Sequence, residues 1–272
     1  MRSFRTNKSA VFAAAALSLL SITACSTQPK APAAVVNVLA PGGKLRAAIN
    51  YGNPILAGKD AATGEPMGVS VDLALELARR LDVPLELITF NAAGKASEAV
   101  AGNSVDIAFY AIDPKRAEDS LFTGPYVVIE GAYMVRQDSP IHSNGQVDRA
   151  GNRVVVGKGG AYDLYLSREL KQAELVRAPT SPEVAEVFLR QQLDVAAGVK
   201  QQMQADAKRV PGLRLLDGRF MEIRQAMAIP KNRAAALSYL SDFVEEMKRS
   251  GFVANALARH HIEGAEVAPA SP

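Results

Sequence analysis

The sequence has no tryptophan, one cysteine and three histidines among its 272 residues. One cysteine cannot form an internal disulfide, and it cannot supply the cysteine clusters of zinc ribbons or iron–sulfur sites. The content of 22% charged and 48% hydrophobic residues is typical of a folded protein and not of a disordered polyelectrolyte. These shortages exclude cysteine-cluster chemistry and leave a folded domain, or a close pair of domains, as the expectation.

The formal net charge of +3 arises in the first segment of the chain. Residues 1–24 carry Arg2, Arg5 and Lys8 without an acid, and include an apolar run over residues 10–20. A basic start, a short apolar run and small residues before a cut predict a secretory signal peptide. The alternative is a membrane-spanning or buried helix, for which the run is short. The rest of the chain has 28 basic and 28 acidic residues, so no nucleic-acid partner is expected.

The end of this segment, Ile22-Thr23-Ala24-Cys25, resembles the bacterial lipobox, which is an aliphatic residue, two small residues and a cysteine. The resemblance implies that Cys25 becomes the first mature residue and carries lipid, which anchors the protein to a membrane in the periplasm. Residues 25–42 are rich in proline, alanine and glycine. They are therefore predicted to be a lipidated tether between the membrane and the folded part.

From residue 45 onward, short apolar runs alternate with amphipathic stretches, which predicts an α/β protein with parallel strands. The expected strands are 45–50, 83–90, 106–110, 153–157, 174–177, 195–199 and 225–229. The expected helices are 70–81 with Ser70 as N-cap, 94–101, 161–171, 180–192, 200–209 and 234–249, followed by a last turn to residue 260.

Two strand–helix–strand blocks of similar size predict two lobes. The first lobe is expected to hold residues 43–127 with 226–263, and the second lobe residues 131–222, so that the chain crosses between the lobes twice at a hinge. Residues 264–272 are expected to be a tail. A cleft between two such lobes is a natural site for a small ligand.

Five short segments carry a further signal, and they occur in a fixed order: Gly43-Lys44-Leu45-Arg46, Gly68-Val69-Ser70-Val71-Asp72-Leu73-Ala74, Val105-Asp106-Ile107-Ala108, Pro114-Lys115-Arg116-Ala117 and Phe122-Thr123-Gly124-Pro125-Tyr126. In this order and spacing they resemble the extracellular solute-binding proteins of the amino-acid type, the binding components of ABC importers. The resemblance covers residues 43–261. It implies a two-lobed periplasmic-binding-protein fold that closes on a small solute and delivers it to an ABC permease in the inner membrane, and we expect a monomer.

Arg116 is the first candidate ligand-binding residue. Asp113 and Pro114 follow an expected strand and favour a helix start, with the aspartate as N-cap and the proline in the first turn. Free backbone N–H groups, the positive helix end and the guanidinium of Arg116 would then suit a carboxylate. In the family that this chain resembles, the matching arginine holds the ligand carboxylate. The alternative is a surface arginine paired with Glu118 or Asp119.

The segment Gly157-Lys158-Gly159-Gly160-Ala161-Tyr162 is the candidate from the second lobe. Its glycines permit close approach of the backbone, and the helix that follows supplies amide donors. The spacing fits neither a P-loop nor a dinucleotide fingerprint. Lys158, Gly159 and Tyr162 are the expected ligand contacts, and the alternative is a simple strand-to-helix turn.

Departures from the family pattern concern the ligand amine. Many amino-acid binders pair the ligand ammonium with acids at two strand ends, where this sequence has Asn50 and Val199. A buried ammonium without a carboxylate is unfavourable, so we expect a small anion-bearing solute, either a non-standard amino acid or an organic acid. Asn50, Tyr51 and Asn53 offer neutral hydrogen-bonding groups, and Tyr110 would narrow the pocket if it pointed inward.

An enzyme is the main rival, because the fold also resembles periplasmic dehydratases that arose from binding proteins. No Ser-His-Asp set, His-Glu-x-x-His motif or pair of carboxylates stands out, so we expect no catalytic residue, cofactor or metal. Glu130 is either a counter-charge for a ligand amine or a hinge salt bridge, and Glu130 or Asp163 alone could act as a general acid. A third hypothesis is a binding protein that presents its ligand to a membrane sensor.

Overall fold

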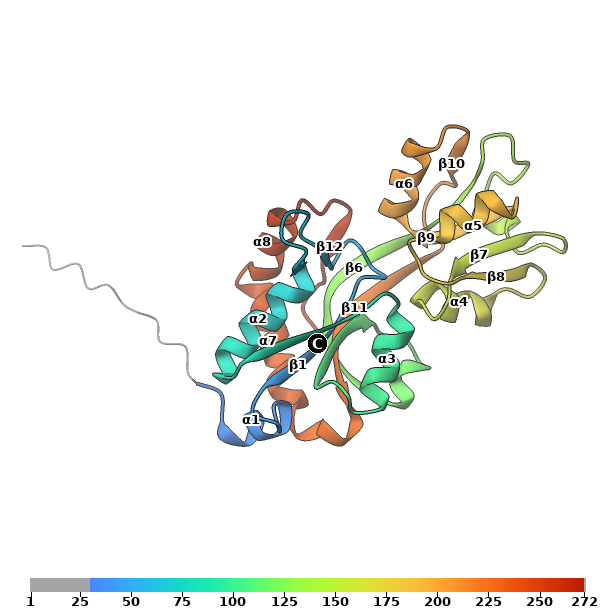
Figure 1. Cartoon of the computed structure of the whole chain (residues 1–272). Helices are drawn as coiled ribbons and strands as arrows, with labels where there is room; N and C mark the ends of the chain where they lie inside the picture. Colours follow the sequence, from blue (N-terminus) through green and yellow to red (C-terminus); the bar gives the residue numbers. More distant parts are fainter. Residues whose placement is uncertain (1–29, 272) are drawn as a thin grey trace, which may run out of the picture.

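The computed structural model describes residues 30–271. The predicted signal peptide and the proposed lipid attachment at Cys25 lie outside the described residues. The described part folds as eight α-helices around a ten-stranded mixed sheet, arranged in two lobes (Figure 1). The predicted fold class is thereby confirmed. No helix within residues 30–271 is long and apolar enough to cross a membrane.

Three parallel strands form the centre of each lobe, and in both lobes the first of them in the chain lies in the middle. The strands are β4 (Leu85–Phe90), β1 (Leu45–Asn50) and β5 (Ile107–Ala111) in the first lobe, and β8 (Glu174–Ala178), β7 (Arg153–Gly157) and β9 (Val195–Val199) in the second. The carboxyl ends of β1, β5, β7 and β9 all point to the region between the lobes. A ligand site is expected at such ends in open α/β sheets.

Two long strands connect the lobes. They are β6 (Ser120–Arg136) and β11 (Met221–Pro230), which pair antiparallel with each other. In the first lobe β11 pairs with β5, and in the second lobe β6 pairs with β9, so one sheet runs through both lobes. These strands are the two crossings between the lobes, and Figure 1 shows them passing from one lobe to the other.

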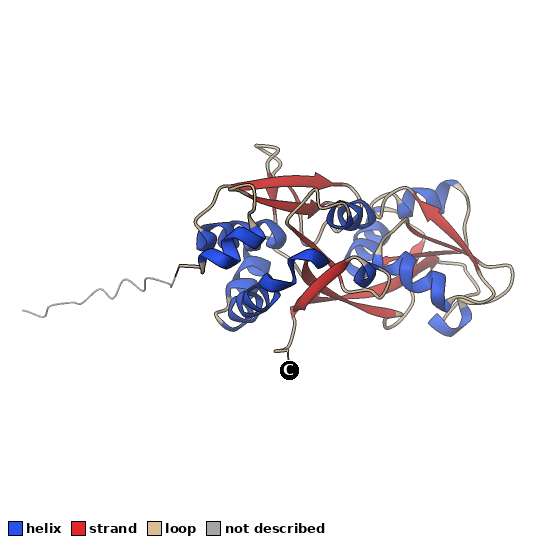
Figure 2. Ribbon diagram, turned by 90° about the horizontal axis from the view of Figure 1, so that it is seen from below, coloured by secondary structure: helices blue, strands red, loops and turns tan. Residues whose placement is uncertain are grey.

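Helices cover both faces of the sheet, as Figure 2 shows. This agrees with strands that are buried on both sides, because alternate residues of β1 enter different cores: Ala47 and Ile49 pack in one cluster and Ala48 in another. The first lobe carries α2 (Val69–Leu81), α3 (Ala93–Ala101), α7 (Leu237–Arg249) and α8 (Phe252–Arg259), and the second carries α4 (Ala161–Glu169), α5 (Val184–Arg190) and α6 (Lys200–Arg209).

Smaller elements complete the chain. Strands β2 (Gly58–Lys59) and β3 (Pro66–Met67) form a separate ribbon, and β10 (Leu213–Leu215) pairs with β6. Short 3-10 turns occur at Arg116–Glu118, Asn144–Gln146 and Lys231–Ala236.

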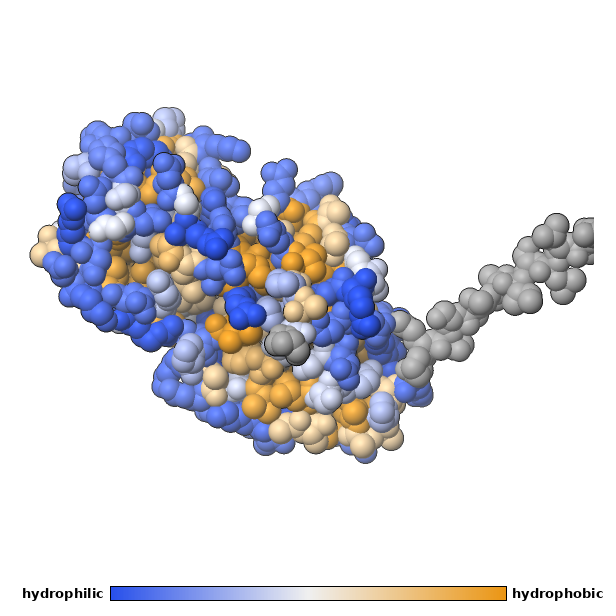
Figure 3. Space-filling view, turned by 180° about the vertical axis from the view of Figure 1, so that it is seen from behind, coloured by the Kyte–Doolittle hydropathy of each residue, from blue (hydrophilic) through white to orange (hydrophobic). Residues whose placement is uncertain are grey.

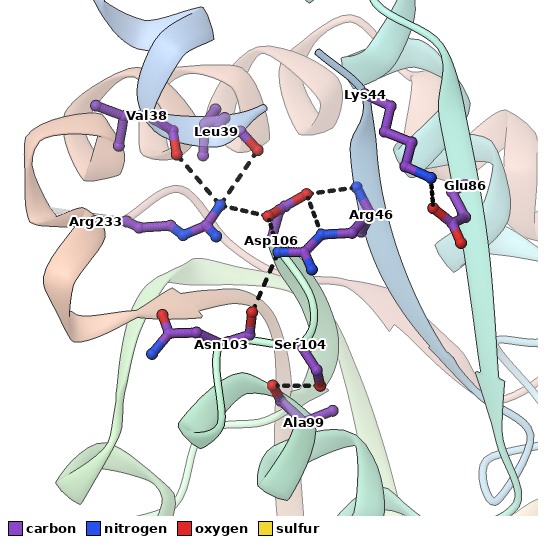
Figure 4. Close-up of polar contacts among 10 residues, drawn as sticks. All are labelled: Val38, Leu39, Lys44, Arg46, Glu86, Ala99, Asn103, Ser104, Asp106 and Arg233. Carbon is purple, nitrogen blue, oxygen red and sulfur yellow. Dashed lines mark hydrogen bonds and ion pairs between the residues drawn. The ribbon is translucent and has the colours of Figure 1, made fainter. Parts of the chain in front are cut away.

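Asp106 holds the strands together at the end of the sheet opposite the cleft (Figure 4). Its carboxylate is fully buried and lies 2.7 Å from Nη2 of Arg46 and 2.6 Å from Nη1 of Arg233. It also accepts the backbone N–H of Arg46 at 2.7 Å, which fixes β5 beside β1. The hydrogen bond to Asp106 raises the pKa of the Arg46 guanidinium. Arg233 donates further to the carbonyls of Val38 and Leu39.

Two segments are more ordered than the sequence predicted. Within the predicted tether 25–42, residues Ala33–Leu39 form helix α1, and Leu39 is fully buried against the first lobe. Within the predicted tail 264–272, residues Ala265–Val267 form strand β12 on the edge of β6. The tether was predicted from composition alone, whereas contacts with distant parts of the chain order both segments. The lobe boundaries given above stay a prediction.

Several element ends also differ from the prediction. Helix α2 begins at Val69 with Gly68 as its N-cap, so the expectation that Ser70 is the cap is wrong. Gly68 has φ of +119°, a backbone conformation that favours glycine. Ser70 is buried inside the helix, where its Oγ lies 3.3 Å from the hydroxyl of Tyr126. Strands 45–50, 153–157 and 195–199 and helix 200–209 match the prediction to the residue.

Candidate functional site

A cleft lies where the carboxyl ends of the central strands meet between the lobes. The space between its walls is about 610 Å³, including the part open to solvent. Seen from behind, the surface is indented between the two lobes (Figure 3). The lining residues are Asn50, Gly52, Asn53, Pro54, Ala93, Tyr110, Ala111, Arg116, Val156, Gly157, Gly160, Ala161, Tyr162, Ser181, Pro182, Ala197, Gly198, Val199, Gln202, Met203, Ile223 and Gln225.

The segment before Arg116 is not the helix start that the sequence predicted. Asp113 does accept a hydrogen bond from the backbone N–H of Lys115 at 2.8 Å, as a cap would. However, only a single 3-10 turn follows, over Arg116–Glu118, because the chain enters strand β6 at Ser120. No helix dipole therefore contributes to anion binding at this point. The side chain of Arg116 itself still reaches the cleft.

Arg116 is buried, with 4% of its surface exposed. Its Nη1 donates to the carbonyl of Ala111 at 2.9 Å, and its Nη2 donates across the cleft to the carbonyl of Gly159 at 3.0 Å. The guanidinium carbon lies 5.2 Å from the ring centre of Tyr110, and Nε has no hydrogen-bond partner. Burial lowers the pKa of the guanidinium. Arg116 is thus a cation that the protein leaves incompletely compensated.

The surface alternative for Arg116 does not apply. Within residues 30–271, no carboxylate lies within ion-pair distance of its guanidinium, and Glu118 pairs with Lys115 instead. A buried cation without an anion is unfavourable unless a ligand supplies one. The geometry is therefore that of an anion-binding position.

Neutral amide side chains share the first-lobe wall with Arg116. Asn53 is buried, and neither its Nδ2 nor its Oδ1 has a hydrogen-bond partner. Gln225 on the hinge strand β11 is also buried, with Oε1 unpartnered. Asn50, in contrast, uses its Oδ1 to accept the N–H of Gly52 at 2.9 Å. Buried polar groups without partners are rare, so Asn53 and Gln225 mark positions where a ligand or water completes the site.

Two tyrosines line the cleft through their rings. The hydroxyl of Tyr110 is 2.7 Å from Oγ of Ser120, and Tyr162 donates to the carbonyl of Glu130 at 3.3 Å. Burial raises the pKa of both phenols. Tyr162 packs so closely on the hinge strand that a Cβ at Gly131 would lie 2.5 Å from its ring. Both hydroxyls already have partners, so the rings act as apolar wall.

Of the predicted ligand-binding residues, the structure brings five together in the lining: Asn50, Asn53, Tyr110, Arg116 and Tyr162. The other three lie outside it. Tyr51 is half-buried, with its ring centre 5.7 Å from Nζ of Lys59, and Lys158 has an exposed side chain. Gly159 supplies the carbonyl that Arg116 binds, and its φ of +69° suits glycine.

Sequence reasoning missed several lining residues, among them the buried Gln225. Its one signal was a glutamine directly before the apolar run Ala226-Met227-Ala228-Ile229 of β11. The sequence predicted that α4 begins at the site, but it did not reveal that α3 and α6 also begin beside the cleft. The lining includes the first residue of α3, Ala93, and the residues preceding α4 and α6, Gly160 and Val199. Their free N–H groups add to the positive potential near Arg116.

Arg116 is the only charged residue in the lining described within residues 30–271. Glu130 lies outside it and forms two ion pairs, with Lys200 at 2.6 Å and Arg219 at 2.9 Å. These contacts, first the hydrogen bond from Lys200, lower the pKa of Glu130. Asp163 is also outside the lining, and it accepts the N–H of Gly159 at 2.8 Å. In the same described part, no His, Cys, Asp and Glu side chains are grouped to hold a metal ion.

Residues 45–262 match the family model of bacterial extracellular solute-binding proteins, family 3. The chain belongs to this family. No curated protein sequence matches the chain.

Solved structures with the same fold come from proteins of different roles. A mutant of ArgBP from T. maritima has a TM-score of 0.72 and 21% identity, covering 84% of this chain and 100% of its own. An ancestral amino acid-binding protein, AncCDT-1, a precursor of cyclohexadienyl dehydratase, has a TM-score of 0.70 and 20% identity, covering 84% of this chain and 99% of its own. A histidine kinase sensor domain similar to periplasmic binding proteins has a TM-score of 0.70 and 19% identity, covering 83% of this chain and 98% of its own. At these identities the likeness shows the fold alone.

Proposed function

We propose that this chain is a solute-binding lipoprotein, which captures a small anion-bearing solute in the interlobe cleft and delivers it to an ABC importer. The solute is amino-acid-like or an organic acid. The observation that carries the proposal is the buried guanidinium of Arg116, which has an unpartnered Nε and no carboxylate within ion-pair distance among residues 30–271. A ligand carboxylate supplies the negative charge that pairs with this guanidinium.

The position of Arg116 also couples binding to closure. Its guanidinium belongs to the first lobe and donates to the carbonyl of Gly159 in the second lobe. A ligand held by Arg116 therefore meets both lobes at once, and the hinge strands β6 and β11 are the two connections that bend when the lobes separate. Closure sequesters the solute until a permease in the inner membrane opens the cleft. Lipid on Cys25 keeps the protein at a membrane in the periplasm.

A dehydratase-like enzyme and a partner of a membrane sensor are the rivals, because the fold does not decide between these roles. Among the lining residues described, the ionisable groups are Arg116, Tyr110 and Tyr162, and burial raises the pKa of both tyrosines. A general acid–base catalyst works best with a pKa near the working pH. The lining thus favours binding over turnover.

The test starts from the mature protein purified under native conditions. Mass spectrometry of co-purified small molecules is followed by a thermal-shift screen of small anions, in which a ligand raises the melting temperature by mass action. The Arg116→Ala variant should bind the ligand at least about 30-fold more weakly, because one partner of a buried charge pair is removed. Arg190→Ala, at an exposed arginine of α5, is the matched control.

Unchanged affinity in Arg116→Ala contradicts the anchor role of Arg116. Conversion of the bound solute, detected by mass spectrometry, favours the enzyme. A permease and ATPase encoded beside this protein favour import, and a sensor kinase in their place favours signalling.

A further inference from the structure

We infer that the cleft takes a short carboxylic acid without a cationic amine, of the 2-hydroxy or 2-oxo acid class, and that Asn53 and Gln225 recognise its neutral polar group. This inference rests on the proposed function and deepens it by naming the class of solute.

The charge balance of the cleft is the first argument. Arg116 contributes the one charge among the described lining residues, so a bound carboxylate brings the total to zero. The ammonium of an amino acid would add a second, uncompensated positive charge to the same buried space. Carboxylates close in the chain to lining residues are already engaged: Asp113 with Arg168, Asp163 with the N–H of Gly159, Glu183 with the hydroxyl of Thr180, and Glu222 with Arg219. Burying an unpaired ammonium is strongly unfavourable.

The hydrogen-bonding capacity of the wall is the second argument. Asn53 presents one unpartnered donor and one unpartnered acceptor, and Gln225 presents an unpartnered acceptor. A hydroxyl can donate to one amide and accept from another, and a keto oxygen can accept from the Asn53 amide. An ammonium has three donors and no acceptor, so it can donate to the two amide oxygens but leaves the Asn53 N–H groups unpaired, and a keto oxygen leaves the two amide oxygens unpaired. A hydroxyl pairs with both kinds of group. A site strongly rejects a ligand analogue that leaves the buried polar groups of the site unpaired.

The register of the sheet places one of these amides beside the anion position. Gln225 on β11 lies opposite Ala111 at the end of β5, and the carbonyl of Ala111 accepts from Nη1 of Arg116. Asn53 follows the neighbouring strand β1 in the chain. A group on the carbon next to a carboxylate therefore falls between Arg116 and the amides. Apolar residues, including Val156, form much of the remaining wall, which suits a short hydrocarbon chain.

Calorimetry with matched compounds tests this inference. The probes are alanine, leucine and phenylalanine, each beside its 2-hydroxy and 2-oxo counterpart, so that only the group next to the carboxylate changes. At least one hydroxy or oxo acid should bind tenfold or more tightly than its amino acid. Equal or tighter binding of the amino acids overturns the inference, and so does the absence of binding by every hydroxy and oxo acid. In that last case, the proposed function still stands if another anion binds the wild-type protein and does not bind the Arg116→Ala variant.

A gain of specificity provides the second arm. Asn53→Asp adds the missing carboxylate, so the amino acids should gain about tenfold in affinity and the hydroxy acids should lose about tenfold. Asn50→Asp serves as a second variant if Asn53→Asp does not fold, as judged by its melting curve. Asn255→Asp, at an exposed position of α8, is the charge-matched control and should change neither the affinity for amino acids nor the affinity for hydroxy acids. Unaltered preference in both cleft variants contradicts the role given to the amides.

Discussion

Arg168 of the second lobe lies 2.9 Å from Asp113 of the first lobe, measured from Nη2 to Oδ2. Asp113 precedes the turn that carries Arg116, and it accepts the N–H of Lys115 at 2.8 Å. Arg168 lies on α4, whose first residues line the cleft. The ion pair thus joins the two elements that a ligand would hold together, and it requires the lobes to be close.

Removal of this ion pair should weaken ligand binding modestly. The Arg168 side chain is 42% exposed, so solvent screens this ion pair although the Asp113 side chain is only 5% exposed, and Arg168→Ala should lower affinity by about two- to fivefold. Most of the change should appear as faster ligand dissociation, because the contact forms in the closed state. Stopped-flow measurements at low and high salt check this, with Arg190→Ala as control. Identical dissociation rates in the variant and the wild type would show that the pair plays no part in closure.

Arg116 should stabilise the complex but not the ligand-free protein. Its guanidinium is buried without an ion-pair partner among residues 30–271, and replacing a buried ion by an apolar side chain is often neutral or stabilising. We expect Arg116→Met to leave the free energy of unfolding of the ligand-free protein unchanged, or to raise it by about 1 kcal/mol, while ligand binding is lost. Urea denaturation without ligand measures the first effect. A clear loss of ligand-free stability would mean that the hydrogen bonds to Ala111 and Gly159 outweigh the burial of the charge.

The sequence was sufficient for the central strands and for Arg116. Strands buried on both faces are continuous apolar runs bounded by polar residues, so β7 (Arg153–Gly157) and β9 (Val195–Val199) were predicted to the residue. Arg116 follows a strand end, and the ends of parallel strands meet at one edge of a sheet. Its place in the cleft could therefore be predicted even though the expected helix is only a short turn.

The remaining features depend on contacts between residues far apart in the chain. Gln225 enters the cleft only because β11 runs between the lobes beside β5, which no local pattern reveals. Helix α1 is held by Arg233, about two hundred positions later, and β12 is held by the edge of β6. Nη2 of Arg116 donates to the backbone carbonyl of Gly159. Every residue has a backbone carbonyl, so the sequence does not indicate which one accepts.

Gly94 is predicted to permit full closure of the cleft. A Cβ at this position would lie 3.3 Å from Cα of Gly159 in the other lobe. Gly94→Ala should therefore weaken ligand binding by about threefold or more, whereas the ligand-free protein should become up to about 1 kcal/mol more stable, because alanine favours helix α3. Calorimetry and urea denaturation measure the two effects. Gly102→Ala, at the other end of the same helix, should leave affinity unchanged, and equal affinities in both variants would contradict the closure argument.

Asp106 and Asp194 occupy equivalent places in the two lobes and should differ in their importance for stability. Each accepts the backbone N–H of an arginine in the first two residues of the central strand, Arg46 at 2.7 Å and Arg153 at 2.8 Å. The Asp106 side chain is fully buried between two arginines, whereas that of Asp194 is 39% exposed. Asp106→Asn should lower the free energy of unfolding by about 3 kcal/mol and Asp194→Asn by less than about 1 kcal/mol. Similar losses in urea denaturation would show that burial does not decide the difference.

Glu130 should make the stability of the hinge depend on pH in the acid range. Hydrogen bonds from Lys200 and Arg219 lower its pKa from the ordinary value of 4.5, so the folded state favours the carboxylate. Its contribution is therefore present above about pH 4.5 and is lost as the pH falls through the lower folded-state pKa. Glu130→Gln should make the loss of stability between about pH 5 and pH 3 less steep in urea denaturation. Glu186→Gln, at an exposed pair with Arg190, is the control, and parallel acid profiles in Glu130→Gln and the wild type would contradict the prediction.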